Sequence, residues 1–266
     1  MNSIINPILK YAGGKRQLIP TLSKIIPKNF NRYIEPFVGG GALYFYLNKY
    51  DSIISDTNSE LINAYICLRK DSNKIIDILM KYKNEKDFYY DIRSKKFNDK
   101  WKQAARTIYL NRTCFNGLYR VNKKGEFNVP FGQYKNPKFI DIENLKLALP
   151  LLKKTRIYNK DYKYIIDKYA KKQDLVFLDP PYLPISKYSD FKRYTKNQFY
   201  EDDHRQLKLY MDKLSKLGCY VILTNSNSKT IVDMYKEYKI EIVESKRNIN
   251  SKGNLRTGQD IIITNF

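Results

Sequence analysis

The 266-residue sequence contains a single histidine, His204, and only three cysteines, Cys67, Cys114 and Cys219. One histidine cannot build a histidine-rich metal centre, and we expect it at the surface near the start of a helix, which also excludes a Ser-His-Asp triad. The three cysteines are far apart and fit neither a disulfide framework nor a metal-ligand spacing. The sequence therefore predicts reduced thiols, no metal site and a cytoplasmic protein.

Long apolar runs and chain-breaking residues are also scarce. No stretch approaches the roughly 18 consecutive apolar residues of a membrane helix, and residues 1–15 lack the apolar segment of a secretory signal. Glycine and proline number 11 and 10, whereas hydrophobic residues make up 42% of the chain and aromatic residues 14%. This composition excludes a disordered chain and predicts a folded protein that does not enter a membrane.

Acidic residues are few relative to basic ones. Lys and Arg total 49 against 27 Asp and Glu, which gives a net charge of +22 spread along the whole chain. Such an excess is typical of proteins that bind polyphosphate or an anionic membrane surface, although an AT-rich genome would also raise the lysine content. Two acid-poor clusters, residues 187–196 and 246–256, are compatible with nucleic-acid contacts or with a solvated surface.

Hydrophobic patterning predicts an α/β protein whose sheet is interrupted by a helical insertion. Apolar residues at helical spacing predict helices and no strand in the insertion, which we place at residues 57–144. The rest, residues 1–56 and 145–266, is predicted to form one Rossmann-like sheet with helices on both faces. The predicted strands cover 32–37, 52–55, 156–158, 175–178, 220–223, 240–243 and 261–264. The predicted helices cover 42–48, 60–82, 103–110, 162–170 and 203–217, the last ended by Gly218.

A glycine turn follows the first predicted strand, at Phe37-Val38-Gly39-Gly40-Gly41. Glycine lets the backbone approach a ligand closely, and Asp56, at the end of the next strand, stands where such folds place an acid that accepts hydrogen bonds from ribose hydroxyls. Together they predict a cofactor that contains adenosine. A tight turn with a helix-capping Asp56 is the structural alternative. The glycines near Lys15 are too closely spaced for a nucleoside triphosphatase loop.

The tetrapeptide Asp179-Pro180-Pro181-Tyr182 follows a predicted buried strand, at the sheet edge where open α/β folds bind ligands. Two prolines remove two N–H donors and leave a rigid loop of carbonyl acceptors. Asp179 and the Pro180 carbonyl could accept both hydrogens of an exocyclic amine while Tyr182 stacks on its ring. The pattern predicts amine chemistry without histidine or metal. A structural turn after a core strand is the alternative interpretation.

These motifs, in this order, resemble the Dam-type family of S-adenosylmethionine-dependent DNA adenine-N6 methyltransferases of the alpha arrangement. The resemblance covers nearly the whole chain and implies that the insertion is a target-recognition domain with a β-hairpin. It also implies that Tyr11 and Lys15 contact the methionine part of the cofactor, Asp56 the ribose and Asp161 the adenine, with Asp179 at the reacting amine. The full set of predicted cofactor contacts is Tyr11, Lys15, Phe37, Gly39, Gly41, Asp56, Asp161, Tyr162 and Asp179.

Residues 111–132 combine basic, aromatic and amide side chains around two glycines, and resemble the recognition hairpin of the same family. The resemblance implies that Phe115 wedges between bases, that Leu118, Arg120 and Pro130 read base edges, and that GATC is the target. A hairpin with a polar face is the structural alternative. The predicted DNA contacts are Lys10, Arg112, Phe115, Asn116, Leu118, Arg120, Lys123, Lys124, Asn128 and Pro130.

The sequence thus predicts an enzyme that flips an adenine out of double-stranded DNA and methylates it, acting as a monomer with two copies able to meet on a palindromic site. A nicotinamide-dependent oxidoreductase would use the same glycine turn but leaves the tetrapeptide unexplained. A non-catalytic DNA-binding module would bind DNA without methyl transfer. Membership in a restriction-modification pair, a solitary regulatory role and a phage origin all stay open.

Overall fold

The computed structural model describes residues 4–11, 15–122, 124–183, 199–246 and 257–266. The basic cluster at 187–196, nearly all of the cluster at 246–256, and Lys123 lie outside the described residues.

The core is one seven-stranded sheet with the strand order β3-β2-β1-β4-β5-β7-β6. Strands β1 to β5 run parallel to one another, and β7 pairs antiparallel with both β5 and β6. All seven strands occur where the sequence predicts them. Their bounds are β1 Tyr33–Glu35, β2 Ile53–Ser55, β3 Arg156–Tyr158, β4 Leu175–Leu178, β5 Tyr220–Ser226, β6 Lys239–Lys246 and β7 Thr257–Thr264.

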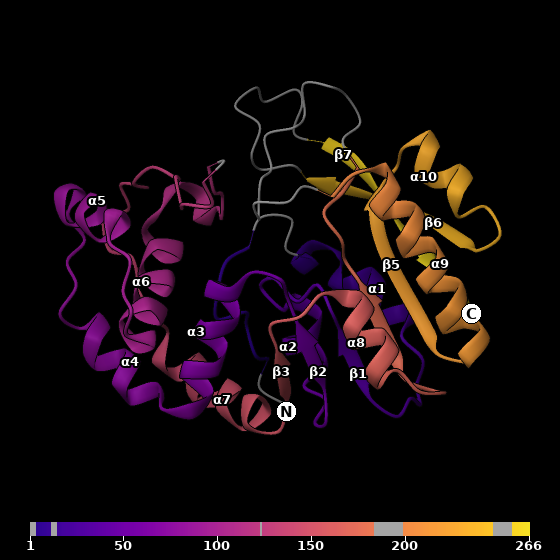
Figure 1. The fold of residues 1–266 in the computed structure, drawn as a ribbon, viewed down its shortest axis with the longest axis horizontal. Coiled ribbons are helices and arrows are strands. Elements are labelled where there is room, and N and C mark those ends of the chain that lie inside the picture. The colour runs from indigo at the N-terminus through magenta and orange to yellow at the C-terminus, as the bar shows by residue number, and fades with distance from the viewer. Residues whose placement is uncertain (1–3, 12–14, 123, 184–198, 247–256) are drawn as a thin grey trace.

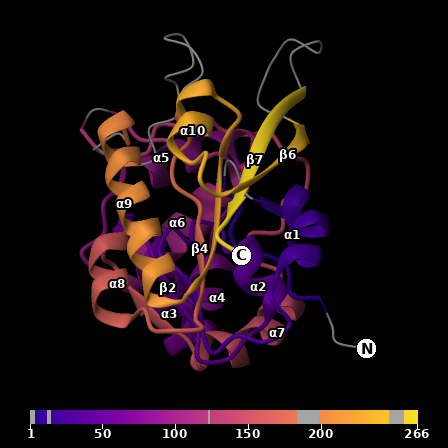
Figure 2. The ribbon, with the colours of Figure 1, turned by 90° about the vertical axis from the view of Figure 1, so that its right-hand side faces the viewer.

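Helices cover both faces of this sheet, as predicted. Helices α8 (Tyr162–Tyr169) and α9 (Glu201–Leu217) lie on one side of the strands, and α1 (Ile19–Ile25) and α2 (Ala42–Leu47) on the other (Figure 2). Alternate strand residues face the two layers, so that Tyr33 belongs to one buried cluster and Ile34 to the other. A short helix, α10 (Lys229–Met234), adds Ile231 to the cluster with α8 and α9.

A group of helices from the middle of the chain extends away from the α2 side of the sheet (Figure 1). The predicted helix over 60–82 is two helices, because Asp71 adopts an extended conformation and its carboxylate accepts a hydrogen bond from the Lys74 N–H, which starts a new helix. The five helices are α3 (Ser59–Lys70), α4 (Ser72–Leu79), α5 (Lys86–Ser94), α6 (Lys100–Thr113) and α7 (Ile142–Lys153). Helix α7 runs across position 144, where the sequence suggests the end of the insertion.

An antiparallel loop between α6 and α7 occupies the place of the predicted hairpin. Its two arms pair through the isolated bridges Cys114–Phe131 and Val121–Phe127 rather than through continuous strands. A single 3₁₀ turn, Phe115–Gly117, interrupts the first arm, with Asn116 and Gly117 both at positive φ. An added Cβ on Gly117 would collide with the Lys10 side chain, so glycine lets the loop approach the N-terminal segment.

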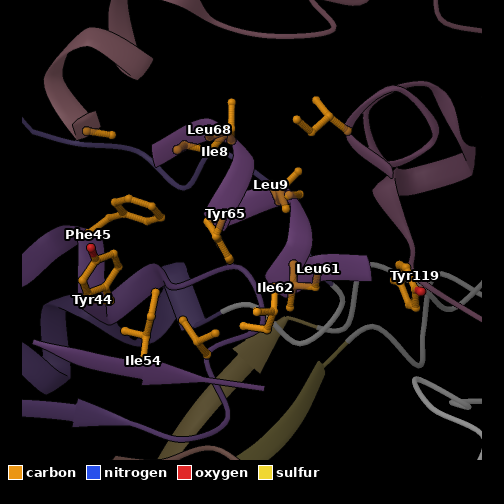
Figure 3. Close-up of a cluster of buried hydrophobic side chains, with 14 of the residues drawn as sticks. Ile8, Leu9, Tyr44, Phe45, Ile54, Leu61, Ile62, Tyr65, Leu68 and Tyr119 are labelled. Carbon is orange, nitrogen blue, oxygen red and sulfur yellow. The ribbon is translucent and has the colours of Figure 1, made fainter. Parts of the chain in front are cut away.

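Packing between α2 and α3 joins the helical group to the sheet. The Phe45 ring from α2 lies beside the Tyr65 ring from α3, with centres 6.3 Å apart, in a buried cluster (Figure 3). The Tyr65 hydroxyl donates a hydrogen bond to the Gly39 carbonyl at 3.1 Å. The glycine turn is therefore fixed from the side of the helical group.

His204 contradicts its prediction, because its side chain is completely buried rather than at the surface. It lies on the same face of α9 as Leu207, Met211 and Leu214, which pack against the sheet. Its spacing of three residues from Leu207 is the sequence signal that would have indicated a buried position in the apolar stripe of the helix. No helix in the described parts of the chain has the length and apolar character needed to span a membrane.

Candidate active site

The predicted catalytic residues lie at the carboxyl edge of the sheet, next to the point between β1 and β4 where the strand order reverses. Asp179 directly follows β4, and its Oδ1 atom lies 2.7 Å from Nζ of Lys15. The Thr224 hydroxyl of β5 donates a hydrogen bond to the same Oδ1 at 2.6 Å. Within the described residues no hydrogen bond involves Oδ2, so this oxygen is available to a donor on a substrate.

In this pocket burial leaves the pKa of Asp179 above its usual value, and the Lys15 ammonium counteracts that effect by favouring the charged form. Burial alone would lower the pKa of Lys15, but the neighbouring Asp179 carboxylate and Tyr182 raise it well above its usual value. Burial raises the pKa of Asp179, and the Lys15 ammonium and the Thr224 hydroxyl oppose that shift. The Lys15 ammonium also lies 4.5 Å from the centre of the Tyr182 ring. One lysine therefore fixes both the acid and the aromatic ring of the tetrapeptide.

A second carboxyl group, Glu35, is buried beside this pair at the end of β1. Tyr33 donates a hydrogen bond to it at 2.9 Å. Burial raises the pKa of Glu35 well above its usual value, and the charge of Asp179 acts in the same direction. Glu35 was not among the predicted site residues, although it opens the motif Glu35-Pro36-Phe37 in the sequence.

The glycine turn is held by Tyr11 on one side and by Asp56 on the other. Gly39 and Gly41 have φ of 47° and 66°, in the left-handed region. A Cβ on Gly39 would lie 2.9 Å from the Tyr11 ring, so the absence of a side chain makes room for Tyr11. Among the predicted cofactor residues, Gly39 thus contacts both Tyr11 and Asp56.

Asp56 has the structural role that the sequence leaves open, and its contact with the ribose stays a prediction. Its carboxylate accepts hydrogen bonds from the Gly39 N–H at 3.0 Å and from the Asn58 N–H at 2.9 Å, just before α3. Burial raises the pKa of Asp56 to about 6, although these backbone donors oppose the shift. Each carboxylate oxygen has a second lone pair, so the group that closes the turn can also accept from a ligand hydroxyl.

Aromatic rings line the sheet edge beyond this turn. The rings of Phe37 and Tyr162 stack with centres 5.2 Å apart, and Phe199 meets the Phe37 ring edge-on at 6.0 Å. Asp161 is exposed at the start of α8, where its carboxylate accepts a hydrogen bond from the Tyr164 N–H. A close-approach turn, an acid and a flat apolar wall fit an adenosine-containing cofactor.

The antiparallel loop displays the predicted base-contacting residues. Phe115 is 49% exposed, and Asn116 and Pro130 are also exposed. Arg120 is partly buried and bonded across the loop to Asn128, with its Nε donating to the amide oxygen at 2.8 Å and its Nη2 to the backbone carbonyl at 3.3 Å. These contacts pre-orient the guanidinium of Arg120 and leave its Nη1 group to other acceptors.

A basic depression of about 340 Å³ lies beside this loop. Arg112 is largely buried there, and its Nη2 donates a hydrogen bond to the Ile8 carbonyl. Burial lowers the pKa of Arg112 and also that of Lys10. The sequence predicts Lys10 and Arg112 as DNA contacts but misses the rest of the wall. The lining residues are Lys10, Arg112, Tyr134, Lys135, Asn136, Pro137 and Lys138.

The structure thus brings the predicted residues together in three groups. Lys15, Asp179 and Tyr182 form one group with the unpredicted Thr224, the residues around the glycine turn form the second, and the residues of the antiparallel loop form the third. Tyr119, also unpredicted, connects the loop to the glycine turn, because its ring stacks against Tyr11 with centres 6.1 Å apart. Tyr119 is buried while its neighbours in the loop are more exposed, an alternation that is visible in the sequence only once the loop is known to be extended.

Comparison with known proteins gives matches over nearly the whole chain. The family profile described as D12 class N6 adenine-specific DNA methyltransferase matches residues 11–249. The type II methyltransferase M.MjaIII of Methanocaldococcus jannaschii is 42% identical over 288 residues, which cover 98% of this chain and 99% of that protein. The type II methyltransferase M1.LlaDCHI of Lactococcus lactis subsp. cremoris is 38% identical, with 98% and 96% covered. The DNA adenine methylase of Escherichia coli K12 is 31% identical, with 96% and 93% covered.

The Lys15–Asp179 pair predicts a pH-dependent loss of stability in Lys15→Met. Without the cation, burial raises the folded-state pKa of Asp179 further above its unfolded value, so folding is penalised as the pH rises through the folded pKa. We expect the variant to lose about 3 kcal/mol of unfolding free energy at pH 8 and much less at pH 5, measured by urea unfolding. The double variant Lys15→Met/Asp179→Asn should lose that pH dependence. Equal losses at both pH values in Lys15→Met would contradict this account of the pair.

Proposed function

Because the chain belongs to the D12 class of N6 adenine-specific DNA methyltransferases, we propose that it flips an adenine out of duplex DNA and methylates its N6 atom within the sequence GATC. Membership of this family establishes the general activity without the target sequence. The protein is an adenine-specific DNA methyltransferase, its substrate is duplex DNA and its methyl donor is S-adenosylmethionine. The oxidoreductase and the non-catalytic module are therefore not retained.

The free Oδ2 of Asp179 is the observation that carries the chemical part of this proposal. Lys15 and Thr224 both hold Oδ1, so the carboxylate is charged and fixed while Oδ2 points to no partner in the described chain. The amine of adenine carries two hydrogens and a lone pair that is delocalised into the ring. Asp179 Oδ2 accepts one hydrogen and the Pro180 carbonyl the other, which turns the lone pair toward the methyl donor.

The charge on Asp179 also favours the later part of the transfer. S-adenosylmethionine supplies a methyl group made electrophilic by its sulfonium. As N6 gains that methyl group it becomes positively charged until it loses a proton, and the ionised Asp179 stabilises the developing charge. Tyr182, whose ring is fixed by the Lys15 ammonium, stacks on the flipped base.

The predicted cofactor residues form one connected wall for S-adenosylmethionine. Gly39, Gly41 and Tyr11 shape the turn that approaches the methionine part, together with Lys15. Asp56 receives the ribose hydroxyls. The remaining contacts, to the adenine ring, come from Phe37, Asp161 and Tyr162.

The DNA side of the proposal rests on the antiparallel loop and the basic depression. We assign residues 57–144 to target recognition and the rest to catalysis, with α7 belonging to both parts. Phe115 is the exposed aromatic wedge, Leu118, Arg120 and Pro130 read bases, and Asn116 and Lys124 contact the backbone. Lys10 and Arg112, with Lys135 and Lys138, give the depression a positive charge that suits phosphate. A monomer suffices for one strand of a palindromic site.

A direct test follows the methyl group. The purified protein is incubated with unmethylated plasmid DNA and S-adenosylmethionine, the DNA is digested to nucleosides, and a second portion is sequenced with detection of modified bases. We expect N6-methyladenine in GATC. N6-methyladenine in another sequence would overturn the GATC part alone, and N4-methylcytosine would overturn the assignment of the active site.

Asp179→Asn should lower the single-turnover rate of methyl transfer roughly 100-fold or more, because the neutral amide no longer stabilises the charge on N6. Binding of S-adenosylmethionine, measured by calorimetry, should be nearly unchanged. Tyr182→Phe keeps the stacking ring and should retain most activity, whereas Tyr182→Ala should lose about 1–3 kcal/mol of base stacking. A near-normal rate in Asp179→Asn would remove this residue from the mechanism.

Arg120→Ala should relax specificity at the guanine of GATC, since a guanidinium matches guanine O6 and N7. The expected cost is about 1–3 kcal/mol on GATC, with little change on DNA altered at that guanine, measured by competition among all single-base variants. Lys124→Ala is the matched control and should weaken every sequence alike. Asn128→Ala, which removes a support of Arg120, should give a smaller effect of the same pattern. A uniform loss in Arg120→Ala would identify it as a phosphate contact.

A further inference from the structure

His204 takes no part in the chemistry above, yet it is completely buried beside the catalytic loop. A buried polar side chain without a functional or structural partner is costly, so its contacts indicate what it does. Its Nδ1 atom lies 3.3 Å from Nδ2 of Asn225, the residue that follows Thr224 in β5. His204 therefore contacts β5 at the residue next to Thr224, which supplies a hydrogen bond to Asp179.

Asn225 also forms a hydrogen bond with Leu183, the residue that follows the catalytic tetrapeptide. Its Oδ1 accepts hydrogen bonds from the Leu183 N–H at 3.3 Å and from the Ser226 N–H at 2.9 Å. The Ser226 hydroxyl donates to the Leu183 carbonyl at 3.0 Å. Both backbone groups of Leu183, the residue after Tyr182, are thus fixed by β5.

This pattern determines the protonation state of the histidine. Since Oδ1 of Asn225 accepts, its Nδ2 is the donor, and Nδ1 of His204 must be an unprotonated acceptor. Burial lowers the pKa of His204 to about 4, although Asp203, the Pro181 backbone and Glu201 act in the opposite direction. The ring is therefore neutral at physiological pH with its hydrogen on Nε2, an atom that has no hydrogen-bond partner in the described chain, while its Nδ1 accepts from the Asn225 amide.

The same ring also contacts the wall assigned to the cofactor. Phe199 meets the His204 ring edge-on, with centres 4.8 Å apart, and meets Phe37 in the same way. His204 consequently touches both the support of the catalytic loop and the support of the aromatic wall. A leucine at this position would fill the space but could not orient Asn225.

We propose that His204 is a positioning residue for methyl transfer, which fixes Leu183 through Asn225 and thereby sets the place of Tyr182 and of the Pro180 carbonyl. It does not touch the substrate, and the inference rests on the role proposed above for the loop. Displacement of a reacting group by about 1 Å can cost a factor of roughly 100 in rate, so the orientation of one buried amide can be visible in turnover.

The test compares His204→Leu with His204→Asn, whose side-chain oxygen can occupy the place of Nδ1. We expect His204→Leu to lower kcat by about 10- to 100-fold with the KM for DNA and the affinity for S-adenosylmethionine within about twofold. His204→Asn should recover most of that loss. Tyr235→Phe is the matched control: it removes another buried polar atom of the same core cluster, on the residue that follows α10, and should leave kcat unchanged.

A second variant keeps the test decisive if His204→Leu folds poorly. Asn225→Ala removes the link and leaves the histidine, and it should lower kcat by a similar factor, with no further loss when His204→Leu is added. Normalising each rate to the bound S-adenosylmethionine separates turnover from the amount of folded protein. Normal kcat in His204→Leu, or an equal loss in His204→Leu and His204→Asn, would overturn the proposal. Absence of adenine methylation by the wild-type protein would instead overturn the proposed function.

Discussion

The buried ion pair between Lys15 and Asp179 is the contact on which the site depends. Taking two charges out of water costs several kcal/mol per ion, and a well-packed apolar pair would be at least as stable in many proteins. The chain retains the pair at the meeting point of the N-terminal segment, β4 and β5. Its effect is to favour the ionised form of a buried carboxylate and to engage one of its oxygens, Oδ1, while no hydrogen bond to Oδ2 occurs within the described residues. The ion pair is thus explained better by chemistry than by stability.

Aromatic contacts join the glycine turn to the antiparallel loop. Tyr11 packs on Gly39 and stacks with Tyr119, whose neighbours Leu118 and Arg120 are assigned to bases. The Tyr119 hydroxyl also lies 3.4 Å from Oδ1 of Asn58, the residue whose N–H binds Asp56. The glycine turn and the antiparallel loop therefore pack on the same two rings, those of Tyr11 and Tyr119.

The sequence predicts what depends on local pattern and misses what depends on packing. The five parallel strands were predictable because they are short apolar runs with turn residues at their ends, and the antiparallel β6 and β7 because each contains apolar residues at 240–243 or 261–264. Asp179 and Asp56 follow from their place after such runs. The break at Asp71 was not resolved from the apolar spacing, which continues through it. His204 was misplaced because three acids precede it. The partner of Asp179 could not be predicted, since Thr224 and Lys15 reach it only through the fold.

Net charge is a poor guide to the DNA surface, because some of the cationic side chains form structural contacts inside the protein. Arg32 pairs with the fully buried Asp174, and Arg106 binds Glu60 and two backbone carbonyls. Arg69 donates to the Thr155 carbonyl. Such arginines hold elements together and release no counterions when DNA binds. We therefore expect the salt dependence of DNA affinity to be weaker than a charge of +22 would imply.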